Sequence, residues 1–408
     1  MTRIDRVVVV GGGLAGAKTV EALREQGFEG AVTLLAAEAH LPYERPPLSK
    51  AYLAGRASLD DTVVHEAGWY LDHDVDLRTG VRVTSVDALA HRVRLADGAE
   101  LGYDRLVLAT GSAPRHLSLP GATEGAVHYL RTREDAQALR ELFGPGRRLI
   151  VVGGGWVGLE VAAAATEAGT HVTVLEAADL PLLRVLGPRV ARILADVHRA
   201  RGVDLRLGVR IAGLVNEGGR ATGVRLDDGL VLEGDAVLAG IGVLPEVGLA
   251  RSAGLEVQDG VLVDSALRTS DPHVFAVGDM ANHDHPVLGY RVRVEHWANA
   301  LNQPAAAVAT LLGRRTPYTR LPYFFSDQYD VGMEYLGHPG HQRTRVVIRG
   351  DVDAPAFVAF WVDGIGHVRA VLSVNVWDVV DEVRPLLAEG RPVAPERLAD
   401  PSVALSAL

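Results

Sequence analysis

The feature that most constrains the fold is a glycine-rich turn that occurs twice. Residues 11–16 (GGGLAG) and 153–158 (GGGWVG) both have the spacing G-x-G-x-x-G. In this pattern the first glycine makes a tight strand-to-helix turn, the second lets the backbone approach a diphosphate, and the third lets helix and strand pack closely. The following helix offers free N–H groups to the anion. The sequence therefore predicts two dinucleotide-binding turns.

Each turn lies in the context that the pattern requires. A short apolar run precedes it, a helical pattern follows, and a second apolar run comes next, as in a βαβ unit. The two units repeat about 142 positions apart. We predict strands at 7–10, 31–35, 149–152 and 172–175, and helices at 15–26 and 157–168.

The rest of the chain extends this plan. We predict antiparallel strands at 82–86, 91–95 and within 224–237, buried strands at 106–108 and 274–277, C-terminal strands at 343–348, 356–362 and 368–374, and a helix at 377–388. The fold class is α/β, with two Rossmann-like dinucleotide-binding domains and a C-terminal α+β domain. We expect the first domain at 1–113 and 243–319, the second at 114–242, and the third at 320–408.

The residue at the end of the second strand distinguishes the two units. In the second unit it is Glu176, whose carboxylate can accept hydrogen bonds from both ribose hydroxyls. It would repel a 2′-phosphate by roughly 1–4 kcal/mol at contact distance, which predicts NADH over NADPH. In the first unit Ala36 and Ala37 occupy this place, and Glu38 is the nearest acid.

Composition excludes several kinds of protein. The chain has no cysteine, so it has no disulfide, thiolate metal site or redox-active dithiol. A net charge of −10 argues against nucleic-acid binding. No uncharged run is long enough to span a membrane, and without a signal peptide we expect a cytoplasmic protein. His283 and His285 lack a third ligand, so we predict a surface loop there and no metal.

Beyond these patterns, the chain resembles the FAD-dependent, NADH-dependent ferredoxin reductases that serve cytochrome P450s and Rieske oxygenases. The resemblance covers nearly the whole chain. It is carried by residues 41–53 (LPYERPPLSKAYL), 106–111 (LVLATG), 129–132 (YLRT), 276–279 (AVGD), 294–300 (VEHWANA) and 325–329 (FSDQY). It implies that the first domain holds FAD and the second holds NADH.

The resemblance also implies roles for individual residues. Lys50 and Glu160 would form a catalytic pair beside the flavin that shifts when nicotinamide enters. We place Glu160 in the first turn of its helix. Phe325 stands where the family usually has a tryptophan, so an aromatic face is kept but the indole N–H is lost. The predicted FAD contacts are Gly11, Gly13, Leu14, Ala15, Gly16, Ala37, Glu38, Arg45, Pro46, Lys50, Val83, Ala109, Thr110, Gly111, Arg131, Gly278, Asp279, Glu295, His296, Trp297 and Phe325. The predicted NAD contacts are Gly153, Gly155, Trp156, Val157, Gly158, Glu160, Glu176, Arg184 and Gly242.

The expected activity is electron transfer. FAD accepts two electrons from NADH and releases them singly, which suits a [2Fe-2S] ferredoxin as acceptor. An acidic ferredoxin would need a basic patch, for which Arg291, Arg293, Arg314, Arg315 and Arg320 are candidates. The alternatives are a rubredoxin reductase, a reductase of quinone, oxygen or monodehydroascorbate, and a flavin-bearing interaction protein. The sequence leaves monomer or homodimer open.

Overall fold

The computed structural model describes residues 3–353 and 355–408. The chain divides into two units. Unit 1 is Met1–Glu44, Asp60–Ala113 and Leu244–Phe324, and unit 2 is Arg45–Leu59, Pro114–Val243 and Phe325–Leu408. Two of the points where the chain passes from one unit to the other lie in β8 (Ser112–Pro114) and β16 (Val243–Pro245). The predicted boundaries of three domains remain a prediction.

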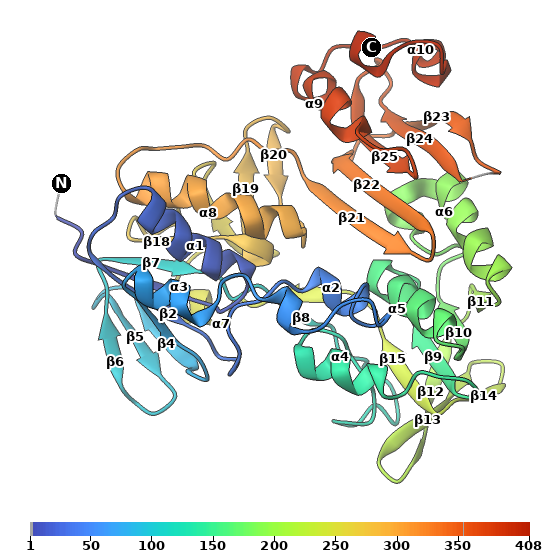
Figure 1. The fold of residues 1–408 in the computed structure, drawn as a ribbon, viewed down its shortest axis with the longest axis horizontal. Helices are drawn as coiled ribbons and strands as arrows, with labels where there is room; N and C mark the ends of the chain where they lie inside the picture. The colour runs from blue at the N-terminus through green and yellow to red at the C-terminus, as the bar shows by residue number, and fades with distance from the viewer. Residues whose placement is uncertain (1–2, 354) are drawn as a thin grey trace. The chain divides into compact units, whose positions relative to one another are not determined.

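Unit 1 is built on a parallel sheet in the order β18-β7-β1-β2-β3. Its centre, β1, forms because four consecutive valines are buried, each at most 4% exposed, as expected for a parallel strand covered on both faces. Helices α1 and α8 pack against each other (Figure 1). The sheet strands are β1 (Arg6–Val10), β2 (Ala31–Leu35), β3 (Val75–Arg78), β7 (Arg105–Leu108) and β18 (Val274–Ala276).

Two smaller sheets and four helices complete unit 1. The sheets are β4 (Val83–Asp87), β5 (Arg92–Leu95) and β6 (Glu100–Gly102), and β17 (Val261–Val263), β19 (Ala281–His285) and β20 (Tyr290–Val292). The helices are α1 (Leu14–Glu25), α3 (Ala67–Asp72), α7 (Gly248–Ser252) and α8 (Trp297–Leu311).

Unit 2 repeats the parallel layout in the order β11-β10-β9-β15. The antiparallel sheet β12-β13-β14 also belongs to this unit. The strands are β9 (Arg148–Val152), β10 (His171–Glu176), β11 (Asp204–Leu207), β12 (Ile211–Glu217), β13 (Arg220–Leu226), β14 (Val231–Glu233) and β15 (Ala236–Ala239). The helices are α2 (Pro46–Ser49), α4 (Arg133–Arg140), α5 (Trp156–Glu167) and α6 (Leu183–Ala200).

The C-terminal part of unit 2 contains a five-stranded sheet in the order β21-β22-β25-β24-β23. Its strands are β21 (Tyr323–Gln328), β22 (Val331–Gly337), β23 (Arg345–Asp351), β24 (Ala356–Val362) and β25 (Val368–Val374), followed by α9 (Val379–Glu389) and α10 (Pro395–Ala399). The predicted α+β character is observed, and β21 and β22 are additions to the predicted strands. Within residues 3–353 and 355–408, every helix is too short or too polar to cross a lipid bilayer.

Candidate functional site

The first glycine turn joins β1 to α1 in unit 1, and two of its glycines are required by packing. Gly11 has φ +124°, and a Cβ there would lie 2.2 Å from the Ala109 carbonyl oxygen. A Cβ at Gly16 would lie 1.9 Å from the Gly11 oxygen. At Gly13, by contrast, a Cβ would meet no described atom within 4 Å. The middle glycine therefore leaves backbone open toward space that a ligand can fill.

The second turn, between β9 and α5 in unit 2, has the same construction. Gly153 has φ +105°, and a Cβ there would lie 2.5 Å from the Gly240 oxygen. A Cβ at Gly158 would lie 2.2 Å from the Gly153 oxygen. At Gly155 the nearest described atom would be 3.7 Å away, an ordinary contact. Both turns thus present an open middle glycine.

The helices after these turns begin without side-chain caps. Gly13 and Gly155 are the N-cap residues, and neither helix has an acidic residue in its first turn. Helix α4 differs, because Thr132 and Asp135 form a capping box there. Uncapped N–H groups beside an open glycine fit the diphosphate of a dinucleotide. The residues present in both units therefore fit the two predicted cofactors.

The strand ends beside the turns differ as predicted. Register pairs Val10 with Leu35 and Val152 with Leu175, so Ala36 and Glu176 occupy equivalent places. The Glu176 carboxylate accepts hydrogen bonds from the backbone N–H groups of Gly154 and Ala178, each at 2.7 Å. One lone pair on each oxygen then remains for ribose hydroxyls.

In unit 1 the nearest acid is held by a different group. The Tyr43 hydroxyl donates to Glu38 Oε2 over 2.5 Å. Tyr43 is 1% exposed, so its position is fixed by the core. Ala36 is also buried, and a Cβ at Gly12 would lie 2.3 Å from its Cβ. The ribose acid on this side is therefore displaced by two residues, if Glu38 serves.

The predicted Lys50–Glu160 ion pair forms within unit 2. Lys50 Nζ lies 2.9 Å from Glu160 Oε1, and the two side chains are 11% and 3% exposed. Ser49 donates to Glu160 Oε2 over 2.5 Å, and Ser326 donates to Oε1 over 2.6 Å. Three donors therefore stabilise one buried carboxylate. The prediction that Glu160 lies in the first turn of its helix was wrong, because α5 begins at Trp156 and puts Glu160 in the second turn.

Other predicted residues of unit 2 lie near this pair or near α4. Lys50 Nζ is 5.3 Å from the centre of the Phe325 ring, a cation–π distance. Arg45 donates to the Arg131 carbonyl over 2.5 Å. Pro46 is the first residue of α2. Arg184 is exposed in the first turn of α6.

The predicted residues of unit 1 come from several elements, and Gly278 is one that lies beside the first turn. Gly278 approaches Ala15, since a Cβ there would lie 3.2 Å from the Ala15 Cβ. Asp279 Oδ2 accepts from the Ser112 hydroxyl over 2.7 Å. The remaining predicted contacts on this side are Leu14 in α1, Ala37 after β2, Val83 in β4, Thr110 and Gly111 after β7, Glu295 and His296 before α8, and Trp297 as its first residue.

Two groups of residues differ from their predictions. His283 and His285 are not in a surface loop but on β19, and each is 1% exposed. Burial lowers the pKa of His283 to about 3, with help from neighbouring His285. Among the described residues, no cluster of three or more His, Asp or Glu side chains is arranged to hold a metal ion. Arg293, a predicted member of the basic patch, is 9% exposed and paired with Asp259 and Glu295.

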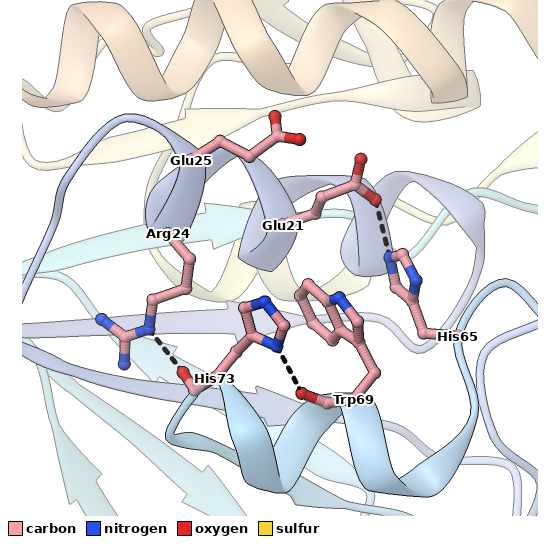
Figure 2. A pocket seen from close by; sticks show the side chains of 6 residues that line it. All are labelled: Glu21, Arg24, Glu25, His65, Trp69 and His73. Atoms are coloured by element: carbon pink, nitrogen blue, oxygen red, sulfur yellow. Dashed lines mark hydrogen bonds and ion pairs between the residues drawn. The ribbon is translucent and has the colours of Figure 1, made fainter.

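A hollow of about 290 Å³ lies beside α1 and α3 in unit 1 (Figure 2). Trp69 stacks between two histidine rings, with centroid distances of 4.0 Å to His65 and 4.1 Å to His73. Glu21 bonds to His65 over 2.6 Å, and Arg24 donates to the His73 carbonyl over 2.7 Å. None of the predicted site residues lines this hollow, and we assign it no ligand.

Sequence reasoning missed the partners of Glu160. Ser49 and Ser326 both lie in stretches that carry the family resemblance, next to Lys50 and Phe325. A buried carboxylate needs donors, so the small hydroxyl residues beside Lys50 and Phe325 were the available signal. Their convergence on one carboxylate appears only in the folded chain.

Comparison with known proteins identifies the family of the chain. Residues 5–304 match the family described as pyridine nucleotide-disulphide oxidoreductase, and residues 323–408 match the family described as reductase C-terminal. The ferredoxin–NAD(+) reductase component of an anthranilate 1,2-dioxygenase system from Burkholderia cepacia is 42% identical, over 98% of each chain. Putidaredoxin reductase from Pseudomonas putida is 38% identical, over 99% of this chain and 97% of that one.

A solved structure supports the fold directly. The crystal structure of the covalent putidaredoxin reductase–putidaredoxin complex matches with a TM-score of 0.94 and 38% identity, over 98% of this chain and 97% of that one. The predicted fold of two dinucleotide-binding domains with a C-terminal domain is confirmed. The chain belongs to the pyridine nucleotide-disulphide oxidoreductase family.

Proposed function

We propose that this protein is an NADH-dependent ferredoxin reductase that passes electrons through FAD to a [2Fe-2S] ferredoxin of a cytochrome P450 or ring-hydroxylating dioxygenase system. The proposal rests on the two glycine turns. Each turn is followed by a helix without a side-chain cap, and the middle glycine of each turn has free space where a side chain would lie. The relatives named as ferredoxin reductases support the choice of acceptor.

The absence of cysteine separates this chain from the disulphide-reducing members of its family. The chain contains no cysteine, so it has no pair of thiols that could store the electrons. When bound, FAD would supply a group that accepts a hydride and releases single electrons. In unit 1 the first turn, Asp279 and Trp297 would hold it. The flavin contacts predicted for Arg45, Pro46, Arg131 and Phe325 belong to unit 2 and remain predictions.

Lys50 and Glu160 would set the electrostatics at the reacting centre. The buried carboxylate keeps the ammonium group in one place at 2.9 Å. A fixed positive charge stabilises negative charge that develops as hydride arrives, without a cost of reorganisation. We therefore assign Lys50 the catalytic role and Glu160 the role of holding it.

The second turn and Glu176 would select NADH. The carboxylate is fixed by two backbone N–H groups, so it cannot easily turn away from a 2′-phosphate. The resulting repulsion is about 1–4 kcal/mol at contact, and we expect at least roughly a fivefold preference for NADH.

An anaerobic titration tests the proposal. The purified protein should be yellow, and NADH should bleach its visible absorption at lower concentration than NADPH. A colourless protein that does not bind added FAD would overturn the proposal.

A panel of acceptors tests the choice of ferredoxin. The rate of reduction of a [2Fe-2S] ferredoxin should exceed the rates for rubredoxin, quinone, oxygen and monodehydroascorbate, and the opposite ranking would reject ferredoxin as acceptor.

Salt dependence tests the docking of the acceptor. Because Arg293 is buried and neutralised, the predicted patch reduces to Arg291, Arg314, Arg315 and Arg320, all exposed. If they attract an acidic ferredoxin, the rate of its reduction should fall with added salt, while the rate of reduction by NADH should change little. The cytoplasmic location and the oligomeric state remain predictions.

A further inference from the structure

A chain of buried polar side chains extends from Glu160 through unit 2 and is not used by the proposed function. Gln328 Nε2 lies 3.2 Å from Ser326 Oγ, and its Oε1 lies 2.8 Å from His198 Nε2. His198 Nδ1 lies 3.2 Å from the Tyr329 hydroxyl. Ser326, Gln328 and His198 are each at most 1% exposed. Water therefore does not supply alternative partners to these three groups.

The direction of every hydrogen bond in this chain follows from its first member. Glu160, paired with the Lys50 ammonium, is a carboxylate and can only accept. The single hydroxyl hydrogen of Ser326 is therefore committed to Glu160, so Ser326 Oγ must accept from the Gln328 amide. The Gln328 carbonyl then faces His198, which must carry its hydrogen on Nε2.

The hydrogen bond at the other end of the chain, between His198 and Tyr329, has the same direction. With hydrogen on Nε2, the Nδ1 of neutral His198 accepts from the Tyr329 hydroxyl. Burial lowers the pKa of His198, and the hydrogen bond to Gln328 raises it by a smaller amount. The lowered pKa favours the neutral imidazole. Reversing any one bond would leave a buried donor or acceptor without a partner, which is unfavourable.

We propose that Gln328 and His198 are positioning residues that lock the Ser326 hydroxyl onto Glu160 and so fix the Lys50–Glu160 pair for hydride transfer. The proposal rests on the proposed function. Glu160 Oε1 accepts from both Lys50 and Ser326, so loss of the Ser326 donor removes one of the two contacts that fix the direction of this oxygen. The chain links α6 and β21 to a side chain of α5.

The tautomer of His198 tests the chain without any measurement of activity. In uniformly ¹⁵N-histidine-labelled protein, the His198 signals are assigned by their loss in His198→Gln. We expect the Nε2–H tautomer in the wild type, and a change of the Nε2 signal in Gln328→Met. A wild-type Nδ1–H tautomer would overturn the proposed direction of the chain.

Stopped-flow reduction by NADH tests the positioning role. A hydrogen bond to a charged group is stronger than one between neutral groups, so Ser326→Ala should slow the limiting rate of flavin reduction about tenfold, and Gln328→Met about threefold. The NADH dissociation constant should change less than twofold. Ser326→Thr, which keeps a hydroxyl, should restore most of the rate.

A matched control separates positioning from loss of folding. Ser373 is 1% exposed in the same C-terminal sheet and donates to the Val376 carbonyl, so Ser373→Ala removes a buried hydroxyl without touching Glu160. We expect a normal limiting rate in this variant. If Glu160→Ala slows reduction but Ser326→Ala does not, the positioning proposal fails alone. If Glu160→Ala has no effect, the role given to Glu160 in the proposed function fails as well.

Discussion

The two glycine turns share their backbone and differ in one residue at the end of the neighbouring strand. In each turn the backbone N–H of the first glycine donates to a carbonyl of that strand, over 2.9 Å from Gly11 to Leu35 and over 2.8 Å from Gly153 to Leu175. The next residue is Ala36 in unit 1 and Glu176 in unit 2. The shared part forms the cradle, and the residue that differs sets which ribose group is read.

The means of holding the acid also differs. Glu176 is fixed by the backbone N–H groups of Gly154 and Ala178, so its position depends on no other side chain's hydroxyl or amide for these two bonds. Glu38 depends on a side chain, the Tyr43 hydroxyl. In the proposed sites the second turn would use an acid held by the backbone, whereas the first turn would use an acid from the following loop that the Tyr43 hydroxyl contacts. This difference makes the two sites separable by mutation.

Substitution of the middle glycines should give the largest effects. Gly13→Ala and Gly155→Ala each place a methyl group where the protein leaves space, so both variants should fold. The methyl group should instead meet the diphosphate and weaken binding about 10- to 100-fold. Gly13→Ala should lose FAD, measured by absorbance of the purified protein. Gly155→Ala should keep FAD and lose NADH affinity, measured by stopped flow. Loss of both cofactors in either variant would contradict the comparison.

Removing the acid of the second unit should have the next largest effect. Glu176→Gln deletes the charge, so the preference for NADH over NADPH should fall about tenfold. The amide has one acceptor oxygen, so one of the two backbone N–H partners is lost and NADH itself should bind more weakly. Steady-state kcat/KM for both nucleotides measures the change. Glu38→Gln is the matched control, and an equal change of preference there would show that the acids are not specific to their units.

Several strands and one ion pair could be predicted from the sequence. Spacing and apolar runs gave β2, β24 and β25 at their observed bounds, because continuous buried runs between turn residues leave little freedom. The Lys50–Glu160 pair also formed as the family resemblance implied. These features depend on local pattern or on a motif, both of which are visible along the chain.

The features that could not be predicted depend on polar residues that become buried. β21 was missed because Ser326 and Gln328 face the interior, which hides the usual alternation of apolar and polar residues. His283 and His285 were placed in a loop for the same reason, although their spacing of two puts both on one face of β19. The bond between Gln328 and His198 joins residues 130 positions apart, and no pattern in the sequence records it.

The two units also differ in the surroundings of a buried histidine, and this difference should make stability depend on pH. His198 in unit 2 has Gln328 and Tyr329 as partners, whereas His283 in unit 1 is buried beside His285, and its pKa falls to about 3. Above pH 6.5 both the folded and unfolded forms of His283 are neutral, and the histidine has no effect on stability. Below that pH only the unfolded state binds the proton, so the free energy of unfolding should fall by about 1.4 kcal/mol per pH unit until about pH 3.

Urea unfolding at pH 7, 6 and 5 measures this slope. His283→Gln should flatten it relative to the wild type, although the variant itself will be less stable at pH 7. His341 is exposed, so His341→Gln is the matched control and should leave the slope unchanged. Equal slopes in the wild type and His283→Gln would mean that acid does not act through His283.

The smallest effect should come from the tyrosine that orients Glu38. Tyr43→Phe keeps the buried ring and removes only the hydroxyl, so packing in unit 1 should be preserved. Loss of one hydrogen bond to a carboxylate that is partly open to water should weaken FAD binding by about 1 kcal/mol, or roughly fivefold. Reconstitution of the apoprotein with FAD, followed by fluorescence quenching, measures the change, with NADH affinity as the internal control.

A double variant tests whether Tyr43 acts through Glu38. Adding Glu38→Gln to Tyr43→Phe should weaken FAD binding by less than the sum of the two single changes, because both act through one carboxylate. Fully additive losses would show that Tyr43 and Glu38 act independently, and that unit 1 does not borrow its acid in the way that the comparison with Glu176 requires.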